Sequence, residues 1–166
     1  MIDIERINAL NIAEAREAFV RCCGSTRWAE GMVERRPFAN EDVLLAVADE
    51  LFDSLKLDDW LEAFGHHPQI GDVDSLRKKF AATADWSRIE QAGAAAATEA
   101  VLADLAEGNR RYLDKFGHIF IVCATGKSAA EMLAILKSRI GNEPACELSI
   151  AAEQQRAITG LRLEKL

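Results

Sequence analysis

The stretch NEDVLLAVADELFDSL, residues 40–55, predicts the fold class of this chain. Asn40 is a favoured N-cap residue, and it precedes a run in which apolar residues recur at spacings of three and four. That spacing places the apolar side chains on one stripe of an α-helix, and we expect the stripe to be buried. Its members are Val43, Leu44, Val47, Leu51 and Leu55.

Similar helix signals continue on both sides of this stretch. Residues 11–22 are expected to form a helix that ends at Gly24, and Ser25 caps a shorter one that stops near Arg36, because Pro37 cannot continue it. The apolar stripe of the first helix is expected to contain Ile12, Ala15, Ala18 and Phe19. Further helices are expected from Asp58 to Gly65, from Ser75 to Phe80, from Ser87 to Tyr112 with or without a break near Thr98, from Ser128 to Ile140, and from Pro144 onward.

Two segments depart from the helical pattern. Residues 65–74 contain two glycines and Pro68 without helical periodicity, so we expect a loop there, ordered or mobile. The run from Phe116 to Ala124 looks like a β-strand, but it has no second strand to pair with, so we expect a buried extended segment or a tight helical turn. The predicted fold is therefore all-α, a single-domain bundle over residues 1–166 with about seven to nine helices.

The composition is that of a globular chain, with 49% apolar and 28% charged residues. Lys and Arg number 20 against 27 Asp and Glu, and a net charge of −7 argues against a nucleic-acid partner. An anionic small molecule stays compatible with this charge, because a pocket needs only one or two well-placed donors. No run approaches membrane-spanning length and the first residues lack a signal-peptide pattern, so we expect no membrane association and a cytoplasmic location.

The four cysteines, Cys22, Cys23, Cys123 and Cys146, form no metal-binding pattern. No Cys-x-x-Cys pair occurs, and none of the cysteines has a histidine at ligand spacing. Adjacent Cys22 and Cys23 point in different directions on a helix, which argues against a disulfide framework and favours a reducing compartment. We expect all four to be small packing residues, and we expect no metal site.

His67 is the first candidate for chemistry. It directly precedes Pro68, whose ring pushes its predecessor into an extended conformation, so a stiff loop displays the imidazole. Imidazole titrates near neutral pH and suits a general acid or base. A lone loop histidine is nevertheless more often a surface or structural residue, and the same holds for His66, which faces the other way.

Ser87, Glu90 and Gln91 share the first turns of one predicted helix. A hydroxyl, a carboxylate and an amide together can orient a polar heterocycle. The same Ser-x-x-Glu pattern is also an ordinary capping box, which by itself is the favoured interpretation. Arg139 and Arg162 are likewise more often solvated helix charges than ligand contacts.

Four motifs in order and register change this balance. His-Pro-x-Ile-Gly-Asp lies at 67–72, Trp-Ser-x-x-Glu-Gln-x-x-Ala at 86–94, Tyr-x-x-x-Phe-Gly-x-x-Phe-Ile-Val-Cys-Ala-x-Gly at 112–126, and Ile-Thr-Gly-Leu-Arg-Leu-Glu-Lys-Leu at 158–166. Over essentially its whole length the chain resembles the 2-oxo-4-hydroxy-4-carboxy-5-ureidoimidazoline (OHCU) decarboxylase family. One departure is Gln69, where many relatives carry a basic residue.

The resemblance implies an all-α bundle without cofactor or metal, usually a homodimer, that acts on a small ureido-imidazoline. At matched positions, His67 corresponds to the catalytic histidine, with Pro68 lining the same pocket. Glu90 is a second catalytic candidate, and Arg162 is an anion contact for which Arg139 is a less secure alternative. The remaining substrate contacts implied are Ser87, Gln91 and the main chain of Phe120, Ile121, Val122, Cys123 and Ala124.

The implied reaction converts the ureido-imidazoline to (S)-allantoin in urate breakdown. Its substrate bears a carboxylate next to a ring C=N, so the electrons released with CO2 flow into the imine and no cofactor is needed as a sink. His67 would then act as general acid or base and help deliver the proton that sets the stereochemistry. Glu90 would orient His67 and hydrogen-bond the substrate, or crowd its carboxylate.

Two other classes stay open. A helical interaction module would expose a large apolar groove and leave the His67 loop irrelevant. A relative with the same fold and different chemistry, such as a hydrolase of another ureide, would differ in product rather than in sequence pattern.

Overall fold

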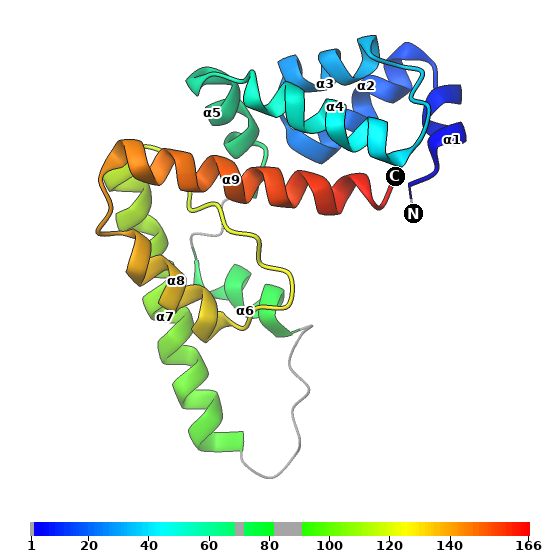
Figure 1. Cartoon of the computed structure of the whole chain (residues 1–166). Coiled ribbons are helices and arrows are strands. Elements are labelled where there is room, and N and C mark those ends of the chain that lie inside the picture. Colours follow the sequence, from blue (N-terminus) through cyan, green and yellow to red (C-terminus); the bar gives the residue numbers. More distant parts are fainter. Residues whose placement is uncertain (1, 69–71, 82–90) are drawn as a thin grey trace. The chain divides into compact units, whose positions relative to one another are not determined.

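Capping side chains start most helices of the computed structural model, which describes residues 2–68, 72–81 and 91–166, with side chains described at 2–68, 72–80 and 98–166. Within these ranges the secondary structure consists of nine helices and no strand (Figure 1), so the all-α prediction is confirmed. Asp3, Asn11, Ser25 and Asn40 each accept a hydrogen bond from the main-chain N–H three residues later. Such caps satisfy main-chain donors that have no partner inside the helix.

The chain divides into two compact units, each described here by itself. Unit 1 comprises residues 1–67 and 151–166, and unit 2 comprises residues 68–150. The prediction of one domain over residues 1–166 stays a prediction. No helix in the described part of the chain has both the length and the apolar character needed to cross a membrane.

Unit 1 is built around α3 (Thr26–Glu34), which packs against α2 (Ile12–Cys23), α4 (Glu41–Asp53) and α5 (Leu57–Gly65). Trp28 of α3 is fully buried, and its indole N–H donates to the carbonyl of Ala48 at 2.9 Å. Phe19 meets the Trp28 ring edge-on at 6.1 Å between centroids. This aromatic contact and the indole hydrogen bond join three helices with no unsatisfied polar group at Trp28.

The remaining parts of unit 1 are its two ends. Near the N-terminus lies α1 (Ile4–Ala9), and the C-terminal part is the section of α9 (Pro144–Leu163) from Ala151 onward. Arg156 on α9 pairs with Asp49 and Asp53 of α4 and lies over the Phe52 ring, 4.7 Å from its centroid. These contacts dock this part of α9 against α4.

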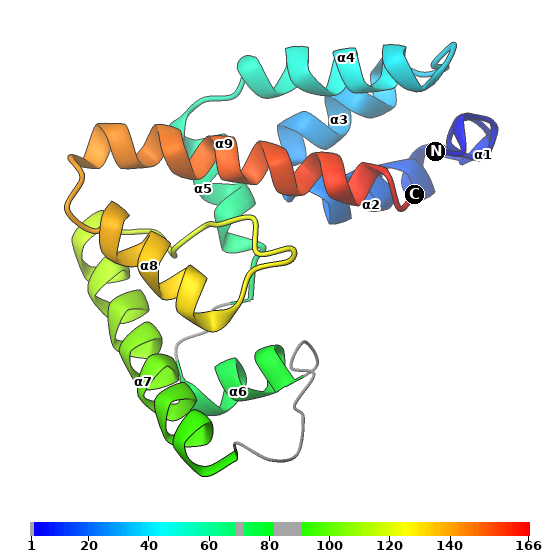
Figure 2. The same cartoon turned by 60° about the horizontal axis from the view of Figure 1, so that its bottom comes forward.

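Unit 2 is held together by α7 (Gln91–Phe116), which packs against α6 (Val73–Ala81) and α8 (Ala129–Arg139). Both views show α7 running beside α8 (Figures 1 and 2). Gly108 lies where the two helices meet, since a Cβ there would be 2.7 Å from Leu136 Cδ2. The buried core between these helices consists of Leu76, Leu102, Leu105, Ala106, Ala129, Met132, Leu133 and Leu136.

The predicted elements agree with the structure in most places. Gly24 ends α2 in the left-handed conformation, and α7 continues without a break at Thr98. Residues 119–124 form neither helix nor strand, so the run is not the tight helical turn, and only Ile121 among them is fully buried, so it is not the buried segment that was expected either. Ser87, the predicted cap of α7, lies outside the described residues, and α1 was not predicted, because six residues carry too little periodicity to detect.

Two residues of the predicted apolar stripes lie on the wrong side of their helices. Ile12 is 69% exposed and Val43 is 40% exposed. The face of α4 that is buried follows a spacing of four instead, through Leu44, Ala48 and Phe52. Packing against α3 selects this face. The apolar residues between 43 and 55 fit more than one helix face, so their spacing alone does not show which face is buried.

Gly24→Ala is expected to destabilise the protein more than the same change at Gly117. Both glycines accept a left-handed φ, +86° and +74°, and both donate their N–H to the carbonyl four residues earlier. A non-glycine residue pays about 1–2 kcal/mol in that conformation. A Cβ on Gly24 would in addition lie 2.8 Å from His66 Cβ, whereas one on Gly117 meets nothing within 4 Å. Equal denaturation midpoints for the two variants would show that the close approach of His66 to Gly24 adds no cost.

Candidate active site

His67 lies just after α5, where the helix gives way to the Pro68 motif. The His67 N–H donates to the Phe64 carbonyl at 3.1 Å, which closes the end of the helix, and His66 is its C-cap residue. The His67 side chain is half-buried, and its Nε2 is 2.7 Å from Oε1 of Gln155 on α9. A loop histidine of this kind is held in place instead of moving freely in solvent.

Gln155 is the partner that the sequence motifs did not single out. Its side chain is fully buried and makes three polar contacts: with His67, with the Cys23 carbonyl at 3.1 Å and with Thr159 Oγ1 at 3.3 Å. On α9 it lies on the buried stripe Ala151, Gln155 and Thr159 at spacings of four. Buried amides are almost always hydrogen-bonded. A glutamine at the spacing of buried alanines could therefore have indicated, from the sequence, a buried amide with a polar partner.

The last turn of α2 gathers the functional candidates of unit 1. Arg162 donates from Nη1 to the carbonyls of Arg21 and Cys22, each at 3.2 Å, and Gln155 donates to the next carbonyl, that of Cys23. A cation is favourable at this end, where unpaired carbonyls carry the negative pole of the helix. The structure therefore brings His67, through Gln155, and Arg162 to the same helix end.

Burial makes the two cysteines of this turn poor nucleophiles. Burial raises the pKa of the Cys22 thiol to about 12, against a smaller opposing effect of the neighbouring Arg162 and Arg21. Burial also raises the pKa of Cys23. Both are packing residues as predicted, and Cys123 is half-buried, but Cys146 is exposed and does not pack in a core.

In unit 2 the predicted substrate-contacting segment is neither helix nor strand, and two cationic side chains bind its main chain. The Ile121 carbonyl accepts from Arg139 Nη1 at 2.8 Å, and the Cys123 carbonyl accepts from Lys127 Nζ at 2.8 Å. The Arg139 guanidinium also lies over the Phe120 ring, 4.8 Å from its centroid. Side-chain contacts thus fix the main chain of this segment within unit 2.

Arg139 is not the solvated charge that the sequence suggested. Only 7% of its surface is exposed, and it donates to Glu147 Oε1 from Nε at 2.8 Å and from Nη2 at 2.5 Å. Glu147 is fully buried and also accepts from Tyr112 and Asn142. Burial would raise the pKa of Glu147, but the hydrogen bonds from Arg139, Tyr112 and Asn142 bring it below its ordinary value. Every N–H-bearing nitrogen of the Arg139 guanidinium thus has an acceptor inside unit 2.

The remaining predicted site residues are either exposed or outside the described part of the chain. Pro68 is exposed at the start of unit 2. Ser87 and Glu90 lie outside the described residues, and Gln91 begins α7 with a side chain that is also outside them. Among the residues that are described, no three His, Cys, Asp or Glu side chains are grouped so that they could hold a metal ion.

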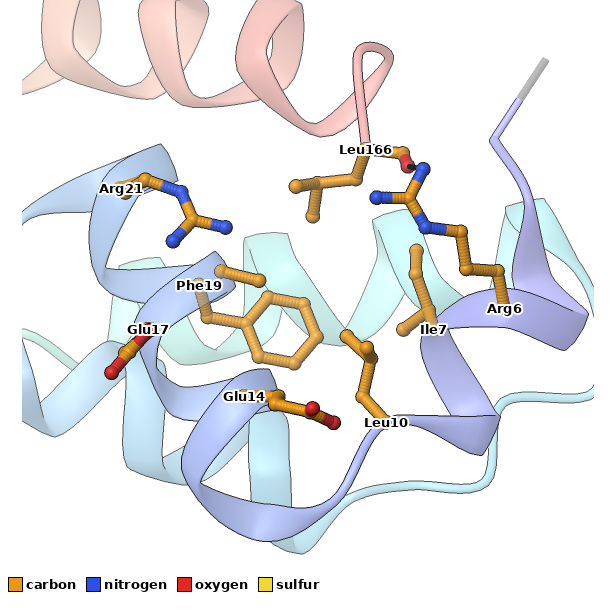
Figure 3. A pocket seen from close by; sticks show the side chains of 9 residues that line it. Arg6, Ile7, Leu10, Glu14, Glu17, Phe19, Arg21 and Leu166 are labelled. Carbon is orange, nitrogen blue, oxygen red and sulfur yellow. Dashed lines mark hydrogen bonds between the residues drawn. The ribbon is translucent and has the colours of Figure 1, made fainter.

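A separate hollow in unit 1 has a volume of about 230 Å³. Arg6 and Arg21 flank Leu166 there, and Arg6 Nη1 donates to the Leu166 carbonyl at 2.9 Å (Figure 3). Phe19 and Leu10 form part of its wall. None of the predicted site residues lines it, so it is distinct from the His67 site.

The fold is all-α, and the half-buried imidazole of His67, held by the buried amide of Gln155, is the candidate group for acid–base chemistry. The family model described as OHCU decarboxylase matches residues 8–164, and the chain belongs to that family, as the motifs predicted. The Arabidopsis thaliana uric acid degradation bifunctional protein TTL is 45% identical over 148 residues. That match covers 87% of this chain and 45% of the Arabidopsis protein, so the chain spans less than half of that relative.

Two further comparisons cover nearly whole chains. The 2-oxo-4-hydroxy-4-carboxy-5-ureidoimidazoline decarboxylase of Amia calva is 34% identical over 170 residues, covering 99% of this chain and 94% of that protein. A crystal structure of OHCU decarboxylase in the presence of (S)-allantoin has a TM-score of 0.71 and 38% identity. The match covers 90% of this chain and 96% of the chain in that crystal structure.

Proposed function

We propose that this chain decarboxylates 2-oxo-4-hydroxy-4-carboxy-5-ureidoimidazoline to (S)-allantoin with its own side chains alone. The main observation in support is the environment of His67. The imidazole of its His-Pro motif lies 2.7 Å from a fully buried amide, and the chain belongs to the OHCU decarboxylase family. An oriented imidazole is the side chain that most often serves as a general acid or base.

The reaction balances without an external electron sink. The bond to the carboxylate breaks, CO2 leaves, and the electron pair forms a C=C bond to the adjoining ring carbon while the imine nitrogen takes up a proton from solvent. The resulting enol loses its hydroxyl proton and becomes a carbonyl, and the ureido-bearing carbon gains a proton from one face. His67 is proposed to take the hydroxyl proton and to deliver the proton to carbon, which gives the S product.

The other matched residues hold the substrate in this proposal. Glu90 orients the hydroxyl, or crowds the carboxylate that is lost, and Ser87 and Gln91 meet the ureido and ring amides. The main chain of residues 120–124 supplies further hydrogen bonds, with Pro68 against the ring. Within that segment the carbonyls of Ile121 and Cys123 already accept from Arg139 and Lys127, so the proposal assigns the substrate to other main-chain groups.

The direct test mixes the protein with freshly generated urate-oxidation product and follows CO2 release and optical rotation together. The proposal expects catalysed CO2 release and an excess of the S enantiomer over the slow spontaneous racemic route. A ring-opened product without CO2 would identify the alternative, a hydrolase of a related ureide.

Arg162→Lys is expected to weaken substrate binding while the fold is kept. A lysine ammonium still brings a positive charge to the carbonyls at the end of α2. In Arg162 both bonds to these carbonyls use Nη1, so the other N–H groups of the planar guanidinium are proposed to bind an anion, and lysine cannot reproduce that planar contact. Steady-state kinetics should show a raised KM with little change in thermal stability. Arg156→Lys, on the same helix, is the control, and equal kinetics for both variants would assign Arg162 to helix capping only.

Chelators are expected to leave turnover unchanged, because the proposed proton transfers need only side chains. The measurement compares initial rates before and after prolonged dialysis against EDTA, with zinc and magnesium added back to parallel samples. Activity that disappears on dialysis and returns with one metal would overturn the cofactor-free proposal.

We extend the proposal to a homodimer that works in the cytoplasm. None of the four cysteines forms a disulfide, which agrees with a reducing compartment. Sedimentation equilibrium at several concentrations tests the dimer, and an oxidised, disulfide-linked form as the active species would argue against the compartment.

A further inference from the structure

The hydrogen bonds around Gln155 determine which end of its amide faces His67. The Cys23 carbonyl, 3.1 Å from Gln155 Nε2, can only accept. The Thr159 hydroxyl gives its proton to the main-chain carbonyl of Gln155 at 2.9 Å, so its oxygen accepts from the amide as well. Two acceptors on one side require the NH2 group there, and the amide oxygen therefore faces the imidazole.

The amide oxygen in turn determines the tautomer of His67. A carbonyl oxygen has no proton to give, so the 2.7 Å contact requires that His67 Nε2 carry the hydrogen. In the neutral imidazole the basic lone pair then lies on Nδ1. Because Gln155 is fully buried on a helix, its amide cannot turn round without breaking the bonds to Cys23 and Thr159.

We propose that Gln155 is the positioning residue of His67, holding the imidazole proton on Nε2 and directing the basic Nδ1 to the reacting centre. The catalytic consequence rests on the proposed function, whereas the tautomer does not. Neighbouring hydrogen-bond partners commonly set which ring nitrogen of a functional histidine is protonated. Here the partner is an uncharged amide, so it orients the ring without adding a negative charge beside it.

The test begins with ¹⁵N NMR of the histidine side chains in the full chain without substrate. The sequence has only three histidines, and the spectrum of His67→Asn identifies the signal of His67 by its absence. At a pH where the His67 imidazole is neutral, the wild-type protein is expected to show a single tautomer with the proton on Nε2. A proton found on Nδ1 would overturn the proposal directly.

Three substitutions then separate positioning from structure. Gln155→Leu keeps the volume but removes the acceptor, and is expected to give mixed tautomers and a kcat lowered about tenfold to 100-fold with KM near wild type. Gln155→Glu restores an acceptor and is expected to return the Nε2 proton and part of kcat. Gln154→Leu, the same change one residue earlier on α9, should leave the tautomer and kcat unchanged.

The outcomes test the positioning role of Gln155 separately from the proposed reaction. If Gln155→Leu keeps a single Nε2 tautomer and wild-type kcat, Gln155 is not a positioning residue. If Gln155→Glu fails to fold, the comparison of Gln155→Leu with Gln154→Leu still decides. If the wild-type protein forms no (S)-allantoin, the proposed function fails, while the NMR arm still determines whether Gln155 sets the tautomer.

Discussion

His67→Asn is expected to lower turnover roughly 100-fold to 10,000-fold, the usual contribution of a side chain that transfers a proton in the transition state. The asparagine amide cannot exchange a proton near neutral pH, so only the uncatalysed racemic route should remain. Because the imidazole is half-buried and donates to Gln155, the change is also expected to cost about 1 kcal/mol of stability, too little to unfold the protein. Initial rates of CO2 release and optical rotation measure the loss, and circular dichroism checks the fold.

His66→Asn is the matched control for this prediction. His66 is exposed and caps α5, and it retains its Cβ beside Gly24 as asparagine. A surface change of this kind typically costs within about 0.5 kcal/mol. If His66→Asn loses activity and His67→Asn does not, the motif has been matched correctly but the proton-transfer residue is wrong. If both variants stay active, the proposed reaction itself is in doubt.

Arg139→Met is expected to destabilise the protein by about 3–5 kcal/mol, the largest stability effect predicted for this chain. The substitution leaves the fully buried Glu147 carboxylate without its cation, although Tyr112 and Asn142 still donate to it. It also removes the donor that holds the Ile121 carbonyl. Urea denaturation measures the change, and Arg110→Met, which breaks an exposed pair with Glu107, is the control that should cost within about 0.5 kcal/mol.

The pH dependence of this variant follows from the lowered pKa of Glu147. A carboxyl group with a lowered folded-state pKa contributes stability above its unfolded pKa, and this contribution is lost as the pH falls through the folded value. Without Arg139, burial raises that pKa, so protonation relieves the variant. The difference between wild type and Arg139→Met should therefore shrink as the pH is lowered from 7 towards about 4.3, the ordinary pKa of Glu.

A double variant distinguishes an unpaired charge from lost packing. Glu147→Gln in the Arg139→Met background removes the buried charge but keeps an acceptor for Tyr112. It should recover part of the stability, because the main cost of breaking a buried ion pair is the charge left behind. A double variant no more stable than Arg139→Met would show that the packing of Arg139 over Phe120 dominates.

Local signals in the sequence were sufficient for most of the helices. Asn11, Ser25, Asn40 and Ser128 cap helices because their side chains reach N–H groups three residues later in the same segment. Likewise, Gly65 and Pro68 disfavour a continuing helix, so the end of α5 just before His67 was predictable. Each of these interactions spans only a few residues, and sequence patterns carry such information directly.

The sequence by itself thus determined the all-α class, the helix boundaries set by caps, and the motifs that identify the family. Only tertiary structure decided which faces are buried, leaving Ile12 and Val43 exposed, and that Arg139 pairs inside unit 2. Only tertiary structure, too, brought Gln155 to His67 across 88 residues of sequence. The physical reason is that a helix presents several faces of similar composition, and packing, burial and the matching of buried donors to acceptors select among them.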